Sequence, residues 1–292
     1  MPSLPRVRFV INPIAGVHGK QDVPALIERH LDRHRAHVEV VLSEYAGHAP
    51  ILTRQAVAEG VDVMVAVGGD GTINEVAGQL VGTQTALGIV PLGSGNGLAR
   101  HLGLPLTATG ALQRLNARRI VRIDSGVIAD RPFFCTAGLG FDAHVGAVFA
   151  AGETRGFQKY VRTTLREYFT YDPFRYRLQA GEHAVDQTAF TVTFANAGQY
   201  GNNAWIAPEA DISDGLLDVC WMRPFPKWLF PVIGARLFSR RLHHSEFLKI
   251  YRAPRARLDF EGELPGHVDG EPSLFRGPLD VYVRPASLGV VV

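Results

Sequence analysis

Three glycines surround one aspartate in the stretch Gly68–Thr72, which follows the apolar run Val61–Val67. That run is short and rich in β-branched residues, which predicts a buried strand. Residues 73–81 can continue as a helix. A strand, a glycine turn and a helix N-terminus form the usual geometry for holding a phosphate group. Glycines let backbone N–H groups approach the anion, and the helix end adds partial positive charge.

The carboxylate of Asp70 is unexpected in such a turn, because it repels a phosphate group. The repulsion is relieved if a divalent cation lies between the two, or if Asp70 orders the waters around that cation. The alternative interpretation is a tight strand–helix turn in which the aspartate acts as a cap. The residues by themselves leave both interpretations open.

Two more glycine loops follow apolar runs, at Asn12–Lys20 and at residues 92–101. Neither matches a common nucleotide motif. The P-loop pattern fails because Gln21 follows Lys20, and the dinucleotide pattern fails because Leu98 occupies its third glycine position. The HRD and DFG signatures of protein kinases are absent from the sequence. A phosphate site in this chain must therefore belong to another class.

Strands alternate with helices in the first 124 residues, which predicts an open parallel sheet whose glycine loops gather at the carboxyl ends of the strands. The expected strands are Arg6–Asn12, His37–Leu42, Val61–Val67 and Leu87–Pro91, and the expected helices are Gln21–His34, His48–Glu59 and Leu106–Asn116. Later residues are rich in strands and predict an antiparallel sandwich. The strands expected there are Arg119–Ile128, Pro132–Ala137, Phe174–Leu178, Thr188–Ala195, Leu216–Met222, Leu248–Tyr251, Ala256–Phe260 and Leu279–Val283. We expect an α/β domain at 1–124, with 283–292 as a candidate return to it, and a β-sandwich domain at 125–282.

The 292 residues carry a net charge of +2, so no global electrostatic argument favours nucleic acid as a partner. Cys135 and Cys220 lie in apolar runs and are expected to be buried free thiols. No apolar run reaches the roughly 18 residues that span a bilayer. The N-terminal residues lack the apolar core of a signal peptide. These features predict a cytoplasmic protein.

Five motifs occur in one order along the chain: NPxxG at Asn12–Gly16, GGDGT at Gly68–Thr72, PxGSGN at Pro91–Asn96, a run at Asp211–Asp218 and DGE at Asp269–Glu271. In this combination and order the chain resembles the diacylglycerol kinase catalytic family, which includes bacterial lipid kinases and sphingosine kinases. The resemblance implies a Rossmann-like α/β domain of the NAD kinase and phosphofructokinase type, followed by a β-sandwich domain.

The resemblance also implies a set of residues that bind ATP: Asn12, Pro13, Ile14, Ala15, Gly16, Ser43, Gly69, Asp70, Gly71, Thr72, Ile73, Asn74, Glu75, Ser94 and Asn96. Ala15 replaces a frequent serine of the family and removes one hydroxyl contact. Gly97 stands where many bacterial members have an aspartate that links the magnesium network to the active site. Asp124 could supply a carboxylate to that network, or could form a partly buried ion pair.

Asp211, Asp214 and the carbonyl group of Leu216 match the family's structural Mg²⁺ site. Two carboxylates and a main-chain oxygen in one turn suit a hard cation. The alternative is an Asp-Gly turn without a metal ion.

Glu271 matches the family's general base, which takes the proton of the acceptor hydroxyl, while Asp70 would position metal and phosphate. Asp269 is a rival base or a metal partner. Without the other motifs, the residues around Glu271 would be interpreted as a solvated turn.

The five ordered motifs, through the family that they resemble, predict an ATP- and Mg²⁺-dependent kinase of a diacylglycerol-like or sphingoid lipid. The run Trp221–Phe238 and the basic stretch Arg236–Arg257 suggest transient contact with a membrane surface, with core packing and a solvated face as the alternatives. A homodimer is one candidate assembly, although the sequence does not determine the oligomeric state. The competing functions are a kinase of a soluble acceptor, as in NAD kinases, and a non-catalytic nucleotide-binding regulator.

Overall fold

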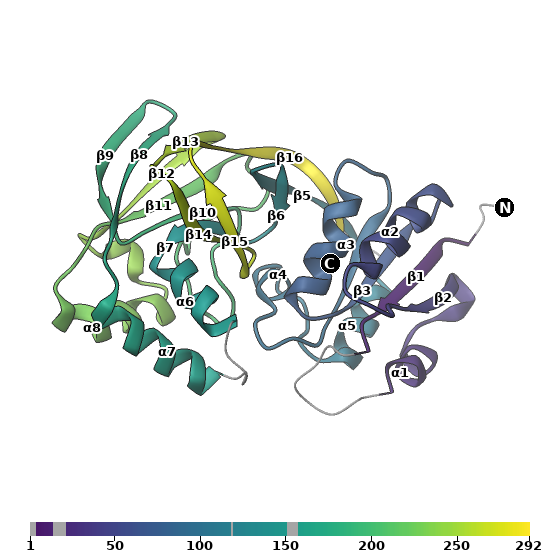
Figure 1. Ribbon diagram of the computed structural model, residues 1–292. Coiled ribbons are helices and arrows are strands. Elements are labelled where there is room, and N and C mark those ends of the chain that lie inside the picture. The colour runs from purple at the N-terminus through teal and green to yellow at the C-terminus, as the bar shows by residue number, and fades with distance from the viewer. Residues whose placement is uncertain (1–3, 14–21, 118, 151–156) are drawn as a thin grey trace. The chain divides into compact units, whose positions relative to one another are not determined.

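The computed structural model describes residues 4–13, 22–117, 119–150 and 157–292 (Figure 1). The chain forms two compact units. Unit 1 comprises Met1–Ser125 and Pro285–Val292, and unit 2 comprises Gly126–Arg284. The chain passes from one unit to the other within two strands, β5 (Ile120–Ile128) and β16 (Leu279–Val291).

Unit 1 is built on a parallel sheet in the order β2-β1-β3-β4. Its strands are β1 (Arg6–Ile11), β2 (His37–Leu42), β3 (Val63–Gly68) and β4 (Ala86–Pro91). The last part of β16 continues the sheet, with Val290 beside Leu87 of β4. Every residue of β3 and β4 is buried, as expected for central parallel strands that are covered on both faces.

Helices cover both faces of this sheet (Figure 1). They are α1 (Val23–His30), α2 (His48–Ala58), α3 (Asp70–Leu80), α4 (Gly97–His101) and α5 (Ala108–Leu115), with a 3-10 turn η1 at Arg33–Arg35. Alternate strand residues, such as Phe9 and Val65, pack with Ile27 of α1 and Leu112 of α5 in one cluster. Helices α2 and α3 pack beside each other on the opposite face.

Unit 2 contains an antiparallel six-stranded sheet in the order β12-β11-β10-β7-β14-β15. These strands are β7 (Thr136–Gly140), β10 (Thr191–Ala195), β11 (Leu217–Met222), β12 (Leu248–Ala253), β14 (Glu263–Val268) and β15 (Glu271–Arg276). A second antiparallel set joins β8 (Phe174–Ala180), β9 (His183–Ala189), β13 (Arg255–Asp259) and the first part of β16. The short β6 (Arg131–Phe133) pairs with the end of β5.

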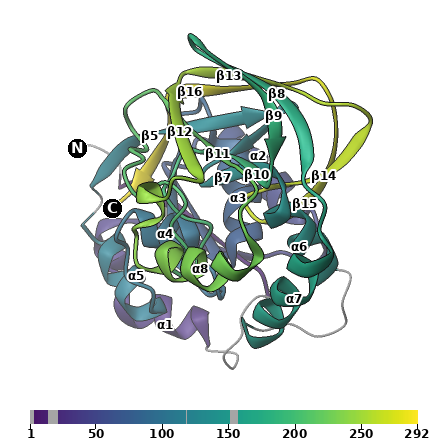
Figure 2. The same cartoon turned by 90° about the vertical axis from the view of Figure 1, so that its left-hand side faces the viewer.

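The central strands β7, β10 and β11 of the six-stranded sheet are buried on both faces. Val219 and Trp221 of β11 point toward the other sheet and pack with Tyr176 and Leu258. The intervening Cys220 and Met222 pack against the helices on the opposite face. Those helices are α6 (Phe141–Ala150), α7 (Phe157–Thr170) and α8 (Phe230–Phe238), which Figure 2 shows from a second side, with the 3-10 turns η2 (Lys227–Leu229) and η3 (Leu242–His244).

The predicted fold class is confirmed: a parallel α/β sheet is followed by an antiparallel sandwich. Three strands were not expected, namely β9, β14 and β15. Helix α1 ends earlier than predicted, because residues 33–35 form a 3-10 turn that begins at the capping carboxylate of Asp32. Both cysteines are buried thiols that take part in no disulfide bond, as predicted. None of the helices in the described ranges combines the length and hydropathy required to cross a bilayer.

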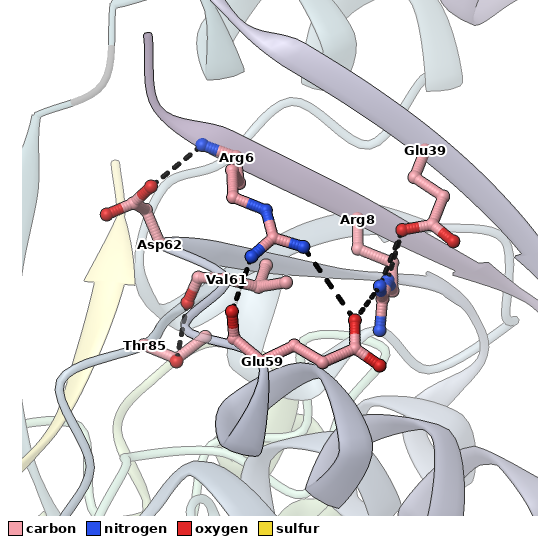
Figure 3. A network of polar contacts seen from close by, with 7 residues as sticks. All are labelled: Arg6, Arg8, Glu39, Glu59, Val61, Asp62 and Thr85. Carbon is pink, nitrogen blue, oxygen red and sulfur yellow. Dashed lines mark hydrogen bonds and ion pairs between the residues drawn. The ribbon is translucent and has the colours of Figure 1, made fainter. Parts of the chain in front are cut away.

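A polar network ties the amino ends of the parallel strands together (Figure 3). Arg8 of β1 is 7% exposed, and its guanidinium group lies 2.6 Å from a carboxylate oxygen of Glu39 and 2.5 Å from one of Glu59. The backbone N–H of Arg6 donates to Asp62 at 2.7 Å, immediately before β3. The network therefore fixes the sheet edge opposite to the one at which the strands run into the glycine loops.

The hydrogen bond from Arg8 is the main cause of the lowered pKa of Glu59. The folded state therefore favours the ionised carboxylate over the protonated one. Its stabilising contribution is present above the ordinary pKa of 4.5 and is lost as the pH falls through the lower folded value.

We expect Glu59→Gln to lower the free energy of unfolding at pH 7 and to make its decline below about pH 4.5 shallower than in the native protein. Urea unfolding between pH 7 and pH 3 measures both effects. The matched control is Glu28→Gln, since that side chain is 73% exposed and lies 3.6 Å from Arg33. Parallel pH curves for the native protein and Glu59→Gln would contradict the assignment.

Candidate active site

The turn between β3 and α3 is shaped by its glycines. A Cβ atom at Gly68 would lie 2.8 Å from the side chain of Thr72, so no larger residue fits there. Helix α3 begins at Asp70, three residues before the predicted start, and the first helical hydrogen bond is that from Ile73 N–H to the carbonyl of Gly69. The backbone N–H groups of residues 70–72 precede that bond, which is the arrangement that favours an anion.

Asp70 binds the next glycine loop instead of capping its own helix. Its Oδ2 accepts a hydrogen bond from the backbone N–H of Asn96 at 2.8 Å, and its Oδ1 accepts one from Gly97 at 2.7 Å. These donors lie at the start of α4. Helix α3 has no side-chain cap, so the interpretation of Asp70 as the cap of its own turn is wrong, and the carboxylate binds the start of α4. The bond to Gly97 falls at the position where many family members have an aspartate.

The two loops approach so closely that only glycine fits between them. A Cβ atom at Gly93 would lie 2.7 Å from the Cα of Gly69, and one at Gly95 would lie 2.6 Å from Oδ2 of Asp70. Asn96 has a left-handed backbone (φ 50°), and its Nδ2 donates to the carbonyl of Gly93 at 2.8 Å. Its buried Oδ1 has no hydrogen-bond partner among the described residues.

The carboxyl ends of β1 and β2 join the same loops. The Nδ2 of Asn12 donates to Oγ1 of Thr72 at 3.2 Å, and the backbone N–H of Ser43 donates to the carbonyl of Ile11 at 2.9 Å. Asn12, Ser43, Thr72, Asp70 and Asn96 therefore meet at one edge of the sheet, as the glycine spacing predicts.

The other residues that are predicted to bind the nucleotide differ in their exposure to solvent. Ser94 is exposed in the second loop, whereas Ile73 is buried in the core of α3. Asn74 is partly buried and Glu75 is exposed, one turn into the helix. Pro13 is exposed at the end of β1, and Gly71 is partly buried. Ile14, Ala15 and Gly16 lie outside the described residues.

In unit 2, Glu271 follows a tight turn between β14 and β15. Val268 pairs with Glu271, and the two residues between them, Asp269 and Gly270, both have left-handed backbones with φ of 49° and 83°. This geometry is that of a type I′ hairpin turn, for which Asp-Gly is a preferred pair. Glu271 is exposed at the first position of β15.

Asp269 holds this turn in place. Its carboxylate accepts hydrogen bonds from the backbone N–H groups of Phe134, Cys135 and Thr136 at 2.8, 2.8 and 3.0 Å. Its own N–H donates to the carbonyl of Thr136 at 2.8 Å. The carboxylate of Asp269 therefore anchors the residue pair that precedes Glu271, and its interpretation as a rival base or a metal partner stays a prediction.

A buried acid–imidazole pair was not predicted from the sequence. Nε2 of His267 lies 3.1 Å from Oδ2 of Asp142, and the hydroxyl groups of Thr191 and Thr193 donate to the same carboxylate at 2.7 and 3.2 Å. Burial opposes ionisation of Asp142, but the hydrogen bonds from His267 and Thr191 outweigh it and lower the pKa. The two partners are 125 positions apart, and no local sequence pattern links them.

The predicted metal residues form two side-chain turns. Oδ1 of Asp211 accepts from the backbone N–H of Ser213 at 2.9 Å, and Oδ1 of Asp214 accepts from that of Leu216 at 2.9 Å. Arg252 pairs with the other oxygen of Asp214. No group of three or more His, Cys, Asp or Glu side chains suited to a metal ion occurs in the ranges that the structure covers. The predicted site had only two carboxylates, so it stays a prediction.

Asp124 is buried and accepts a hydrogen bond from the backbone N–H of Ala286 at 2.7 Å. Its carboxylate thus fixes the point where the C-terminal segment rejoins unit 1.

Comparisons with known proteins agree with this organisation. Residues 6–128 match the sequence profile of the diacylglycerol kinase catalytic domain, and residues 135–292 match that of the YegS C-terminal NAD kinase beta sandwich-like domain. The chain belongs to the diacylglycerol kinase catalytic-domain family. It is therefore an enzyme of the lipid kinase type, and membership of a kinase family implies that it uses a nucleotide.

Individual relatives align with most of the length of this kinase. A "probable lipid kinase YegS-like" of Chromohalobacter salexigens is 31% identical over 242 residues, which is 81% of this chain and 78% of the relative. A "diacylglycerol kinase" of Mycobacterium tuberculosis H37Rv is 33% identical over 229 residues, or 73% and 72%. A crystal structure of a diacylglycerol kinase from Bacillus anthracis has a TM-score of 0.77 at 17% identity, over 100% of this chain and 98% of that one. The last similarity concerns the fold alone.

We expect Gly95→Ala to lower the free energy of unfolding of the kinase by about 1–3 kcal/mol, because its methyl group would push the carboxylate of Asp70 away from α4. Nucleotide affinity should fall as well. Urea unfolding and calorimetric titration with ATP measure the two effects. Gly146→Ala in α6 is the control, since nothing lies within 4 Å of that added Cβ. Equal stability and affinity in both variants would contradict the close packing of the loops.

Proposed function

We propose that this enzyme is an ATP- and Mg²⁺-dependent lipid kinase that transfers the γ-phosphoryl group to the hydroxyl group of a diacylglycerol-like or sphingoid lipid. The observation that supports this most is the pair of glycine loops after β3 and β4, which Asp70 fixes to each other. Loops of this kind offer main-chain N–H groups at close range, which suits a polyphosphate. The names of the relatives favour a lipid as the acceptor.

The residues at the loops fit a nucleotide with its cation. The N–H groups of Gly71 and Thr72 at the start of α3 would donate to phosphate oxygens. The buried Oδ1 of Asn96, which has no partner among the described residues, would accept a hydrogen bond from an adenine amino group or a metal-bound water. Asp70 uses two of the roughly four lone-pair sites of a carboxylate, so it can also accept from such a water. Mg²⁺, when bound, would supply charge that neutralises the transferred group.

Glu271 is the proposed general base. Its carboxylate would accept the proton of the lipid hydroxyl group as the oxygen attacks the γ-phosphorus atom. The carboxylate of a general base must lie within a fraction of an ångström of its productive position beside the hydroxyl group. A side chain on a rigid turn meets this requirement better than one on a flexible loop. The three hydrogen bonds to Asp269 provide that rigidity.

A lipid acceptor also requires access to a membrane. We therefore propose that the enzyme works in the cytoplasm, in transient contact with the inner membrane face.

We expect ATP turnover to depend on a lipid when diacylglycerol, monoacylglycerol and sphingosine in mixed micelles are compared with NAD and with no acceptor. Glu271→Gln should lower kcat about 10²- to 10⁴-fold with little change in the KM for ATP, because it removes the base but keeps the shape of the side chain. Glu263→Gln, at the exposed start of the same hairpin, is the control.

Turnover with NAD alone would contradict a lipid acceptor, and ATP binding without turnover on any acceptor would contradict the proposed reaction. Full activity of Glu271→Gln would remove Glu271 from the role of base while leaving the kinase assignment intact.

For the metal site, we expect Mg²⁺ to raise the free energy of unfolding of the native enzyme, by about 2.7 kcal/mol at a concentration 100 times its Kd. Asp211→Ala should abolish this increase, because it removes one of the two proposed carboxylate ligands. Asp172→Ala, at another exposed aspartate, is the control. The absence of any Mg²⁺-dependent stabilisation in the native enzyme would contradict the site and favour simple turns at Asp211 and Asp214.

A further inference from the structure

Helix α8 is apolar on the side that faces solvent. Pro231, Ala235 and Phe238 follow the i, i+4, i+7 spacing of one helix face, and all three are exposed. Val232 beside them is 44% exposed and Phe238 is 47% exposed. A helix at the surface of a soluble domain normally presents polar side chains there.

The opposite side of α8 is already accounted for by packing within unit 2. Phe230, Ile233 and Leu237 follow the same kind of spacing and join the apolar cluster against the six-stranded sheet. The ring of Phe230 lies 4.1 Å from that of Tyr168 in α7, measured between centroids. The exposed face is therefore a second apolar face, which the fold of unit 2 does not require.

Exposed aromatic side chains extend this face at the amino end of the helix. Trp228 is 75% exposed and Phe169, near the end of α7, is 60% exposed. Nζ of Lys227, the residue before Trp228, donates to the carbonyl of Phe169 at 2.8 Å, which holds η2 against α7. We call the exposed residues Phe169, Trp228, Pro231, Val232, Ala235 and Phe238 the α8 face. Figures 1 and 2 both show α7 and α8 on one side of unit 2.

The segment that contains every residue of the α8 face except Phe169 carries only positive charge. Residues 219–245 include Arg223, Lys227, Arg236, Arg240 and Arg241, and they include no aspartate or glutamate. An apolar face with aromatic residues and basic neighbours matches the chemistry of an anionic bilayer, where acyl chains meet negatively charged headgroups. Tryptophan in particular favours the boundary between headgroups and acyl chains.

We propose that the α8 face docks the enzyme on a bilayer containing anionic lipids, with Trp228 inserted at the headgroup boundary. The inference extends the proposed lipid kinase function, because it names the surface through which the enzyme would reach its acceptor. The nine residues of α8 would lie along the membrane surface and would not cross it.

The tryptophans of the chain make this docking directly measurable. Of the three, Trp205 is 7% exposed and Trp221 is 1% exposed, whereas Trp228 is 75% exposed. A blue shift of intrinsic emission on adding vesicles, or quenching by brominated acyl chains, would therefore report on Trp228. Trp228→Phe separates the probe from the binding, since it should lose the signal while retaining most of the vesicle binding.

The experiment compares phosphatidylcholine vesicles with vesicles that also contain phosphatidylglycerol. We expect binding and a blue shift with the anionic vesicles, weakened by salt because charges at the surface are screened. Val232→Asp combined with Phe238→Asp should reduce cosedimentation at least about tenfold, because two charges would enter the apolar boundary. Leu42→Asp is the control, as that side chain is 53% exposed on β2 of unit 1.

Unchanged cosedimentation of the double variant, or no shift and no quenching of the native enzyme, would overturn the proposal. If the native enzyme and the double variant differ in oligomeric state when no vesicles are present, the α8 face is a contact between two copies of the chain. That result would also overturn the proposal. Turnover of a dispersed short-chain diacylglycerol separates this outcome from the kinase assignment. The double variant should retain that turnover, whereas its absence in the native enzyme would count against the kinase function and not against docking.

Discussion

The carboxylate of Asp70 determines how the two glycine loops of unit 1 can be arranged. It accepts hydrogen bonds from the main-chain N–H groups of Asn96 and Gly97, so these donors at the start of α4 compensate its negative charge. The negative charge that is unexpected in a phosphate-binding turn thus has a structural partner in the protein. The glycines at positions 93 and 95 follow from this contact, because any Cβ there would collide with Gly69 or with the carboxylate itself.

Unit 2 uses the same physical device at Asp269. A carboxylate in a tight turn accepts hydrogen bonds from several main-chain N–H groups, which hold the Asp-Gly pair in place. The base of the proposed mechanism, Glu271, is the residue that follows this pair. Aspartate is suited to both turns because its short side chain reaches nearby backbone donors, and hydrogen bonds to an ionised group are stronger than those between neutral groups.

The parallel sheet could be predicted from sequence because its strands are buried on both faces and appear as continuous β-branched runs, as at Val63–Gly68. Strand β9 was not predicted because most of its residues are exposed and polar, so its pattern carries no apolar signal. The hairpin β14–β15 was not predicted because Gly266, Pro265 and Pro272 interrupt the apolar alternation. The motifs located the loops and the Asp-Gly turn, but the partners of Asp70, Asp269 and His267 are long-range contacts that local spacing cannot encode.

The division of strand β16 between the two units constrains the order in which the molecule can fold. Residues 285–292 complete the parallel sheet of unit 1 beside β4, although all of unit 2 precedes them in the chain. A ribosome that has synthesised the first 125 residues has therefore produced unit 1 without its fifth strand. Strand β16 can pair with β4 only after the residues of unit 2 have been translated. The sheet of unit 1 is therefore complete only after unit 2 has emerged from the ribosome.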